Sequence, residues 1–334
     1  MITYQLKTKE NEPNTFNLAL TTLRIVFMGT PEFAVASLDA LVKAGYNIVG
    51  VVTAPDKPAG RGMKLNESAV KKYAAEKGLN ILQPVKLKDP AFLEELAALQ
   101  ADLQVVVAFR MLPEAVWTMP RLGTINLHGS LLPQYRGAAP INWAVINGEK
   151  ETGVTTFKLK HEIDTGDILL QEAFQVGENE TAGEVHDKMK DIGAGLLVRT
   201  VQGLAEGSLT ETPQPHTVLA SGVEQSLKHA PKIFTDTCKI DWNKPVADIH
   251  NLVRGLSPFP GAFTYVDDKM LKIYRSEIEP APSMLAVPGS HHTDGKTFLK
   301  FAAVDGYIHA TEIQLEGKKK MNVGDFLRGY RFSS

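Results

Sequence analysis

The sequence of 334 residues contains one cysteine, Cys238. A single cysteine forms no internal disulfide, and no cysteine or histidine stands near it at the spacing of zinc ligands, so a reducing compartment and an apolar packing role are expected. Apolar runs of about 18 residues, the length of a membrane-spanning helix, are also missing. The stretch from Met1 to Thr22 lacks the apolar block of a signal peptide. We therefore expect a cytoplasmic protein without a membrane partner.

The sequence also has little net charge. The formal net charge is −2 at pH 7, which argues against indiscriminate nucleic-acid binding by bulk charge but leaves room for a local basic surface. Two enzyme motifs are absent as well. Gly60-Arg61-Gly62 lacks the third glycine and the helix that a dinucleotide fingerprint requires, and no Gly-x-Ser-x-Gly surrounds Ser130. We therefore reject an NAD site and a serine-hydrolase elbow.

The composition is that of a globular protein, with 43% hydrophobic and 22% charged residues. The length predicts two folded units, because domains usually span about 100–200 residues. We expect a flexible extension over residues 1–22 and a main domain over 23–205. A polar, proline-containing linker over 206–228 and a second domain over 229–334 complete the predicted organisation.

The main domain alternates between apolar strand patterns and helical patterns. Residues 23–29, Asn47–Val52 and Leu103–Phe109 read as strands, and Phe33–Ala44 and Ala182–Leu204 read as helices. Alternation of this kind predicts an α/β fold, a Rossmann-like parallel sheet covered by helices on both faces. Ligands bind beyond the carboxyl ends of such strands, so chemistry is expected just after residues 107 and 125.

The predicted second domain has a different sequence pattern. Its short β-like runs, such as Lys272–Tyr274 and Phe298–Ala303, are separated by proline and glycine turns. This pattern predicts a smaller, OB-like β-barrel. Three consecutive lysines, 318–320, could form an RNA-facing surface or simply a solvated loop.

Asn126 and His128 lie two residues apart on a predicted strand, so their side chains project from the same face. Histidine moves protons near neutral pH and an amide donates hydrogen bonds to an oxyanion, which suits acyl transfer. On spacing alone, a histidine on an apolar strand is more often a structural core residue. A later loop contains Asp164 and Asp167, either of which could orient His128, although an acidic loop with a glycine is often only a turn.

Taken together, three segments resemble the folate-dependent formyltransferase family: Asn126-Leu127-His128, then Ser130-Leu131-Leu132-Pro133, then Asp164-Thr165-Gly166-Asp167. The resemblance implies that Asn126, His128 and Asp164 are catalytic. It also implies that the Ser130–Pro133 segment lines the site of 10-formyltetrahydrofolate, the formyl donor, and that no metal takes part. Residues 23–205 would then be the catalytic formyltransferase domain.

Within this family, three features resemble members that formylate the methionine of initiator tRNA. The loop from Pro55 to Lys64 is similar to their basic tRNA-gripping loop, with Arg61 as the principal contact beside Lys57 and Lys64. Arg136–Ile141 continues the match beyond the shared segments. The second domain, with Lys239–Trp242 and Arg254–Pro258, resembles their tRNA-binding barrel.

The resemblance thus implies direct attack of the methionyl amine on the formyl carbon, through a tetrahedral intermediate, for translation initiation. Initiator methionyl-tRNA and the folate would be the partners of a monomer. Two alternatives stay open: a formyltransferase acting on a small amine, such as glycinamide ribonucleotide or an amino sugar, and a non-catalytic folate- or RNA-binding protein. One departure is Ala108-Phe109-Arg110, where many relatives have Ala-Tyr-Gly, at the expected wall of the folate pocket.

Overall fold

The computed structural model describes residues 22–59, 64–215, 218–220, 223–281 and 286–332. The chain divides into two compact units. The first is drawn from residues 1–127, 156–161 and 194–212, and the second from residues 128–155, 162–193 and 213–334. Within the described ranges, no helix combines the length and the apolar character needed to cross a membrane.

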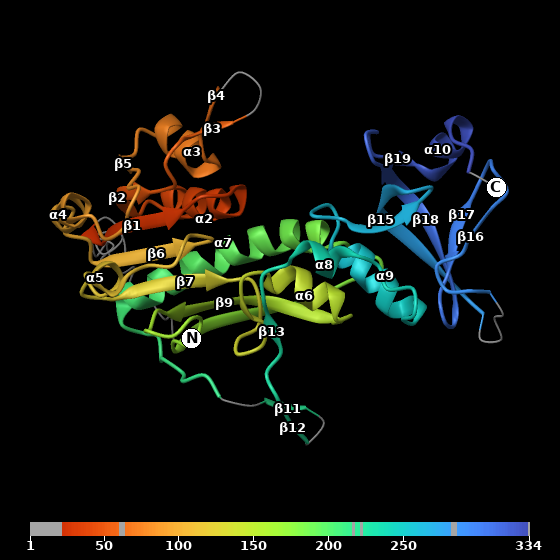
Figure 1. Ribbon diagram of the computed structural model, residues 1–334. Helices are drawn as coiled ribbons and strands as arrows, with labels where there is room; N and C mark the ends of the chain where they lie inside the picture. The colour runs from red at the N-terminus through yellow and green to blue at the C-terminus, as the bar shows by residue number, and fades with distance from the viewer. Residues whose placement is uncertain (1–21, 60–63, 216–217, 221–222, 282–285, 333–334) are drawn as a thin grey trace, which may run out of the picture. The chain divides into compact units, whose positions relative to one another are not determined.

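Seven strands form the main sheet in the order β10-β9-β7-β6-β1-β2-β5 (Figure 1). Their bounds are β1 Arg24–Gly29, β2 Asn47–Val52, β5 Ile81–Leu82, β6 Leu103–Val107, β7 Thr124–His128, β9 Glu151–Lys158 and β10 Ile168–Gln175. Pairing is parallel between β1 and β2, β1 and β6, β2 and β5, and β6 and β7. Every residue of β6 is buried, as expected of a strand covered on both faces. The predicted Rossmann-like parallel sheet is confirmed.

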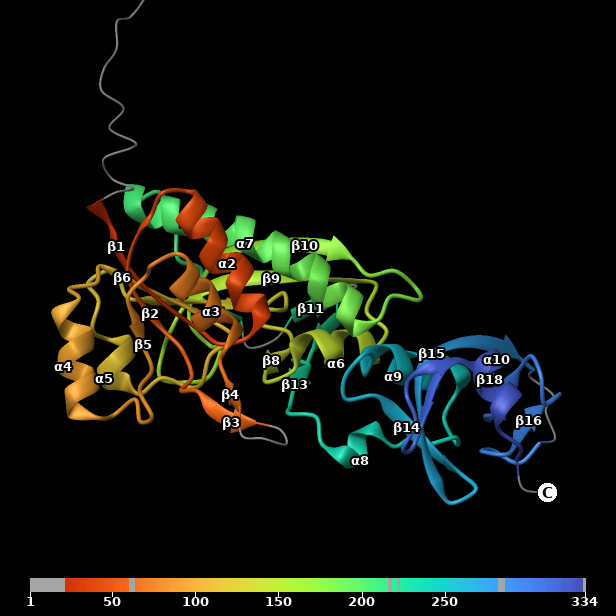
Figure 2. The ribbon, with the colours of Figure 1, turned by 90° about the horizontal axis from the view of Figure 1, so that it is seen from above.

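Helices cover both faces of the parallel strands in the first unit. Their bounds are α2 Glu32–Lys43, α3 Ala69–Glu76, α4 Pro90–Ala98 and α5 Glu114–Trp117. Phe92 of α4 and Val116 of α5 share a buried core with Met28 of β1, whereas α2 packs on the opposite side of the strands (Figure 2). The side chain of Asp89 caps α4 by accepting from the amide of Ala91 at 3.1 Å.

Strands β6 and β7 end next to each other, which fixes where a ligand can meet the sheet. Their register pairs Val106 with Asn126 and Val107 with Leu127. The predicted strand Leu103–Phe109 was too long by two residues, because Ala108 adopts a left-handed backbone conformation with φ of 47° that no strand continues through.

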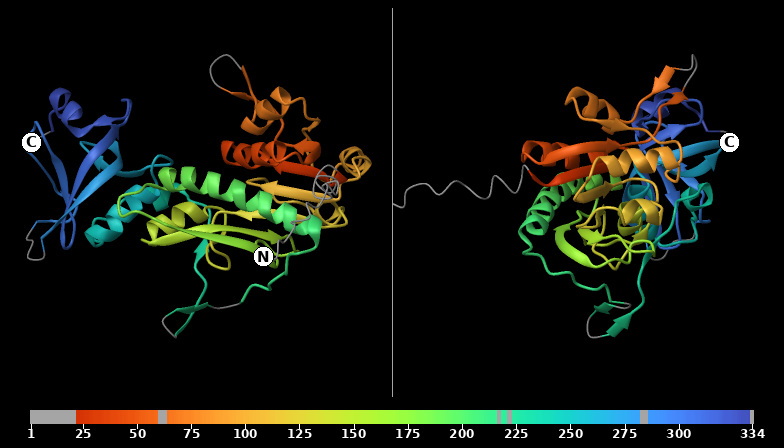
Figure 3. Two further views of the ribbon diagram at one scale, coloured as in Figure 1. Left: turned by 180° about the vertical axis from the view of Figure 1, so that it is seen from behind. Right: turned by 90° about the vertical axis from the view of Figure 1, so that its left-hand side faces the viewer.

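The second unit contains an antiparallel sheet in the order β14-β15-β18-β17-β16, with β19 paired to β18. The bounds are β14 Ala262–Val266, β15 Lys269–Pro280, β16 His291–Thr293, β17 Leu299–Ala302, β18 Gly306–Leu315 and β19 Met321–Asn322. Helices α8 Thr235–Cys238, α9 Val246–Gly255 and α10 Val323–Gly329 supply side chains to its core. Figure 3 shows these strands, in blue, with α10 beside them.

The core of this sheet contains Ile273, Ile308 and Ile313 from the strands, Val253 from α9 and Phe326 from α10. Cys238 is also buried in this core, as its expected packing role requires. The arrangement is an antiparallel half-barrel, which confirms the small OB-like β-domain that the short strand patterns predict.

The remaining elements lie outside these two sheets. Their bounds are β3 Lys57–Ala59, β4 Lys64–Asn66, β8 Arg136–Gly137, α6 Pro140–Ile146, α7 Ala182–Glu206, β11 Val218–Ala220, β12 Val223–Gln225 and β13 His229–Ala230. Helix α7 continues to Glu206, past its predicted end at Leu204. Strand β13 pairs in parallel with β8 (Figure 2). The division of the chain at residues 206 and 229 stays a prediction, and residues 1–21 of the predicted extension lie outside the described ranges.

Candidate active site

Strand β7 carries Asn126 and His128 at its carboxyl end, on one face of the strand. The His128 side chain is buried, with 6% of the residue exposed. Asn126 is half-buried, and its side-chain amide has no hydrogen-bond partner among the described residues. An amide left open at the end of a parallel strand is available to a substrate oxygen.

The turn that follows β7 is held from inside the protein. Thr155 donates from Oγ1 to the Ser130 carbonyl at 2.7 Å and accepts at the same atom from the Leu132 amide at 3.1 Å. Gln171 adds a bond to the Leu132 carbonyl at 2.9 Å. Ser130 itself donates from Oγ to the carbonyl of Gln134 at 2.7 Å. These bonds fix the path of the predicted folate-lining segment.

Most side chains of that segment face the protein interior. Ser130, Leu132 and Pro133 are buried, whereas Leu131 is half-buried and packs against Gly153. A ligand at this turn would therefore meet backbone groups and Leu131. The folate-binding role of Ser130, Leu131, Leu132 and Pro133 stays a prediction.

Asp164 provides a carboxylate close to His128. Nδ1 of His128 lies 3.9 Å from Oδ2 of Asp164, and both side chains are largely buried. Nε2 of the same ring lies 2.9 Å from the carbonyl oxygen of Tyr135. A carbonyl only accepts, so Nε2 carries a hydrogen and the ring takes up its second proton at Nδ1, facing the carboxylate.

The backbone at Asp164 is unusual. Its φ of 54° lies in the left-handed region, which aspartate tolerates better than most residues. One oxygen of its carboxylate, Oδ2, accepts from the amide of Gly137 at 3.0 Å. Strained backbone of this kind gathers at functional sites, where the surrounding structure fixes it.

Two polar side chains support the Asp164 loop from outside. Gln214 donates from Nε2 to the carbonyls of Asp164 and Gly166 at 2.9 and 2.7 Å. Its Oε1 accepts from Nε and Nη2 of Arg136 at 3.0 and 2.6 Å. Burial lowers the pKa of Arg136, and the nearby Asp164 carboxylate partly opposes that shift. The sequence gives no signal for Gln214, because it lies in a polar stretch without a motif.

The departure at Arg110 has a structural role. Its Nη1 donates to the Val85 carbonyl at 2.9 Å, and its Nη2 donates to the Pro84 carbonyl. Burial lowers the pKa of this guanidinium. The side chain therefore ties the segment after β6 to the segment after β5, which a glycine at position 110 cannot do.

The predicted tRNA contacts lie on the β3–β4 hairpin. Lys57 begins β3, its side chain is exposed, and it forms no ion pair with any described residue. Arg61 lies outside the described residues. Lys64 begins β4, and the structure describes only its backbone. The roles of Arg61, Lys57 and Lys64 stay predictions.

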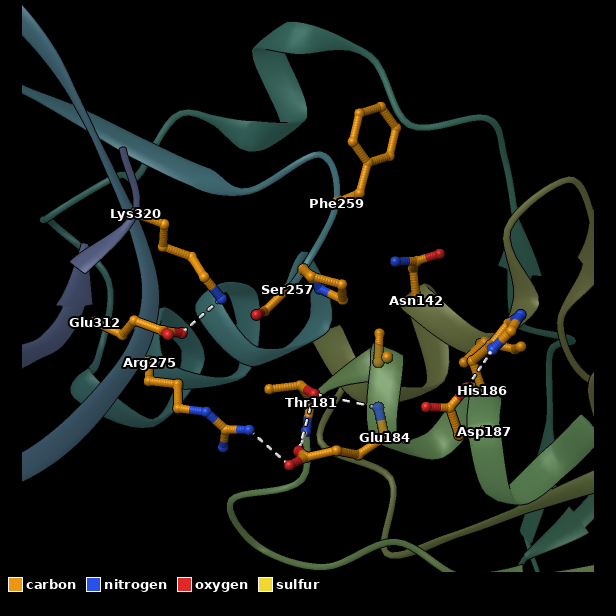
Figure 4. A pocket seen from close by; sticks show the side chains of 14 residues that line it. Asn142, Thr181, Glu184, His186, Asp187, Ser257, Phe259, Arg275, Glu312 and Lys320 are labelled. Carbon is orange, nitrogen blue, oxygen red and sulfur yellow. Dashed lines mark hydrogen bonds and ion pairs between the residues drawn. The ribbon is translucent and has the colours of Figure 1, made fainter. Parts of the chain in front are cut away.

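A separate cavity of about 490 Å³ lies in the second unit (Figure 4). None of the predicted catalytic residues lines it. Its Arg and Lys side chains are paired with carboxylates: Arg275 with Glu184 at 2.6 Å and Lys320 with Glu312 at 3.1 Å. Because the cations are neutralised there, the cavity offers no concentrated positive charge, and Lys320 is not a free member of a basic surface.

The geometry around β7 supports acyl transfer to an amine. Asn126 offers a hydrogen-bond donor for an oxyanion, His128 offers a nitrogen that takes up a proton, and Asp164 offers a negative charge for the resulting imidazolium. Within the described residues, no group of three or more potential metal ligands is found.

Comparison with known proteins agrees with this chemistry. The family profile described as "Formyl transferase" matches residues 23–201, and the profile "Formyl transferase, C-terminal domain" matches residues 232–331. The methionyl-tRNA formyltransferase of Parabacteroides distasonis is 57% identical over 92% of this chain and 96% of its own length. The methionyl-tRNA formyltransferase of Flavobacterium johnsoniae is 48% identical over 93% of this chain and 97% of its own.

Solved structures share the fold at lower identity. The N-formyltransferase of Helicobacter canadensis, in complex with folinic acid and dTDP-3-aminofucose, has a TM-score of 0.65 at 18% identity and covers 90% of this chain and 100% of its own. HypX from Aquifex aeolicus in complex with tetrahydrofolic acid has a TM-score of 0.61 at 18% identity, covering 94% of this chain and 49% of its own. The two family profiles and the near full-length identity to the curated relatives place this chain in the formyl transferase family, among the methionyl-tRNA formyltransferases.

Proposed function

We propose that the enzyme transfers the formyl group of 10-formyltetrahydrofolate to the α-amine of the methionine carried by initiator tRNA. The observation that carries this proposal is 57% identity to a methionyl-tRNA formyltransferase over almost the whole of both chains, the half-barrel domain included. A small-amine acceptor is the alternative within the fold, and nothing in the described residues favours it.

The reaction is direct. The methionyl nitrogen forms a bond to the formyl carbon, and Asn126 donates a hydrogen bond to the oxygen that becomes negative in the tetrahedral intermediate. The bond between that carbon and N10 of the folate then breaks. His128 takes the proton that the attacking amine loses and delivers it towards N10, so tetrahydrofolate leaves neutral at that nitrogen.

Asp164 supports the charged form of His128. The 3.9 Å separation between Nδ1 and Oδ2 leaves room for the pair to close when the ring is protonated. The Gly137 amide, at 3.0 Å, keeps the carboxylate oxygen directed at the ring. The enzyme therefore holds its proton acceptor and the counter-charge in place before substrate arrives.

The donor is assigned to the turn after β7. Its backbone is fixed by Thr155 and Gln171, and a fixed backbone suits recognition of a flat, polar ring system by amide and carbonyl groups. Ser130, Leu131, Leu132 and Pro133 form this proposed wall. No metal is assigned a part in the reaction, because the amide and the imidazole supply the oxyanion donor and the proton acceptor.

The acceptor tRNA is assigned to the β3–β4 hairpin and the half-barrel. Exposed cations such as Lys57, which forms no ion pair within the described part of the chain, suit phosphate contacts, since each one releases counterions on binding. Arg61 is the principal proposed contact, with Lys64 beside it. We expect a monomer that acts in the cytoplasm, where initiator tRNA is aminoacylated.

The test is an acceptor comparison. Purified enzyme receives labelled 10-formyltetrahydrofolate with either methionyl-initiator tRNA or glycinamide ribonucleotide. Formyl-methionyl-tRNA as the sole product is the expected result. Label only on glycinamide ribonucleotide would retain the catalytic residues but reject the tRNA assignment, and no product with either acceptor would reject the proposed activity.

A further inference from the structure

The two catalytic side chains of the second unit are held by one short stretch of backbone. The carbonyl of Tyr135 faces Nε2 of His128 at 2.9 Å, and the amide of Gly137 donates to Asp164 at 3.0 Å. Because these two backbone groups lie two residues apart, any movement of residues 135–137 changes the orientation of both side chains. The precise placement of this stretch therefore matters for the proposed transfer.

That stretch is anchored by the strand that leads into the half-barrel. The amide of Tyr135 donates to the carbonyl of Lys228 at 2.6 Å. Strand β13 pairs with β8 in parallel, and the carbonyl of Ala230 accepts from the amides of Ala138 and Ala139 at 2.7 and 3.2 Å. The carbonyls of Lys228 and Ala230 thus accept from the amide that opens this stretch and from the two amides that follow it.

Side chains reinforce the same contact. Nζ of Lys228 lies 2.5 Å from Oε1 of Glu149, and the same carboxylate oxygen accepts a short hydrogen bond from the Tyr135 hydroxyl. Asn147 donates to that hydroxyl at 3.1 Å. Burial, with Glu149 beside it, raises the pKa of the Tyr135 phenol well above its usual value. The phenol therefore stays protonated and keeps donating to the carboxylate.

Gly137 shows how closely the two strands approach. Its φ is 126°, and a Cβ atom placed there would lie 2.5 Å from the Ala230 carbonyl oxygen. Any other residue would push β13 away from β8. Ala230 itself is fully buried in a small cluster with Tyr135 and Ala144.

The linker is also continuous with the half-barrel core. Pro231 accepts from the indole of Trp143 at 2.7 Å, and the chain then enters α8 and buries Cys238 and Ile240 in the half-barrel. We propose that the segment Lys228–Ala230, where the predicted linker meets the second domain, is a positioning element of the active site, which fixes His128 and Asp164 through the backbone of residues 135–137. This inference rests on the proposed function for its kinetic consequence.

Lys228→Met tests the element against a matched control, Lys232→Met. Both variants lose one exposed cation, but Lys232 lies over the ring of Phe234, whereas Lys228 pairs with Glu149. We expect Lys228→Met to lower kcat about fivefold, because small misplacements of catalytic groups cost rate. The KM of Lys228→Met for tRNA should match that of Lys232→Met. The kcat of Lys232→Met should equal that of the wild type. Lys228→Arg should recover most of the rate that Lys228→Met loses.

Gly137→Ala is the stronger perturbation. We expect kcat to fall about 100-fold, the loss that follows from displacing catalytic groups by about 1 Å. Where this variant does not fold, as judged by its melting temperature, Tyr135→Phe replaces it, because it removes only the hydroxyl contacts to Glu149 and Asn147.

Nitrogen NMR of the His128 ring provides a readout that needs no substrate. In the wild type, the neutral ring should carry its hydrogen on Nε2, and the folded variants should show a mixture of tautomers. If the wild type formylates neither acceptor, the proposed function fails while the spectra still test the positioning. The inference is overturned if Lys228→Met cannot be distinguished from Lys232→Met in kcat, or if folded Gly137→Ala or Tyr135→Phe keeps the wild-type ring spectrum.

Discussion

The active-site stretch and the β3–β4 hairpin are built in opposite ways. Around His128, backbone and side-chain groups are largely buried and are tied by hydrogen bonds to Tyr135, Gly137 and Lys228. On the hairpin, Lys57 is exposed and forms no ion pair within the described ranges. One region is fixed in advance, and the other presents charge to solvent.

The difference follows from what each region has to do. Proton transfer requires groups held within a fraction of an ångström of their working positions, so rigid support raises the rate. Phosphate recognition acts over longer distances and gains from cations that are not already neutralised. Changes at the first region should therefore affect kcat, and changes at the second should affect tRNA affinity and its salt dependence.

Replacing His128 by Ala is the most direct way to break this comparison. We expect kcat to fall about 1,000-fold or more, because the proton acceptor is lost, and Asp164→Ala should also abolish measurable turnover. The dissociation constant for methionyl-tRNA, measured by filter binding, should stay within about twofold of wild type, since neither residue belongs to the proposed tRNA surface. Substantial turnover by either variant would contradict the assignment.

Asn126→Ala should produce the next largest effect. Loss of one oxyanion donor typically reduces kcat about 100-fold, or about 3 kcal/mol. The KM for 10-formyltetrahydrofolate should change little, because the bond strengthens only as negative charge develops. A large rise in KM with kcat intact would instead make Asn126 a ground-state binding residue.

Lys57→Ala and Arg61→Ala test the hairpin half of the comparison. Each should weaken tRNA binding and reduce the slope of log Kd against log salt by about one, while folate binding stays unchanged. Lys72→Ala is the matched control, because Lys72 is an exposed lysine on α3, outside the hairpin. Equal affinity and salt dependence for wild type and the hairpin variants would reject the tRNA role.

A second buried histidine, His250, provides the smallest effect and a contrast with His128. Its Nδ1 lies 2.9 Å from the Ser276 hydroxyl, and burial, with Arg254 nearby, lowers its pKa below 6.5. As pH falls, this histidine is protonated in the unfolded chain before it is protonated in the folded protein. The stability that the neutral histidine contributes is therefore present above pH 6.5 and is lost as pH falls through the lower pKa of the folded state.

The measurement is the melting temperature between pH 7.5 and 5. His250→Gln should show a shallower decline than wild type and retain wild-type kcat at pH 7.5. A decline of equal slope in both proteins would show that other groups govern the acid sensitivity.

Much of the fold follows from the sequence because its strands are strongly patterned. The runs at Asn47–Val52 and around Val105 can be recognised without knowledge of the tertiary structure. The exact end of β6 cannot be, because the left-handed turn at Ala108 depends on the surrounding chain. Strand β13 is missed for a different reason, since a strand of two residues carries no periodicity.

The candidate site also contains residues that the sequence predicts and residues that it does not. Asn126, His128 and Asp164 can be predicted because they stand in ordered motifs, and the structure brings His128 and Asp164 to 3.9 Å; their catalytic roles stay predictions. Tyr135 and Gly137 contribute through backbone atoms, and Gln214 contributes from a polar stretch. Contributions of these kinds leave no residue-type signal in one sequence.

A single-turnover experiment tests the central claim most directly. Excess enzyme is mixed with labelled 10-formyltetrahydrofolate and methionyl-initiator tRNA, and both products are followed in wild type and His128→Ala. The account predicts that wild type releases one tetrahydrofolate for each formyl-methionyl-tRNA formed, and that His128→Ala forms neither on the same time scale. Label accumulating on the enzyme before it reaches tRNA, or equal rates in the two proteins, would contradict it.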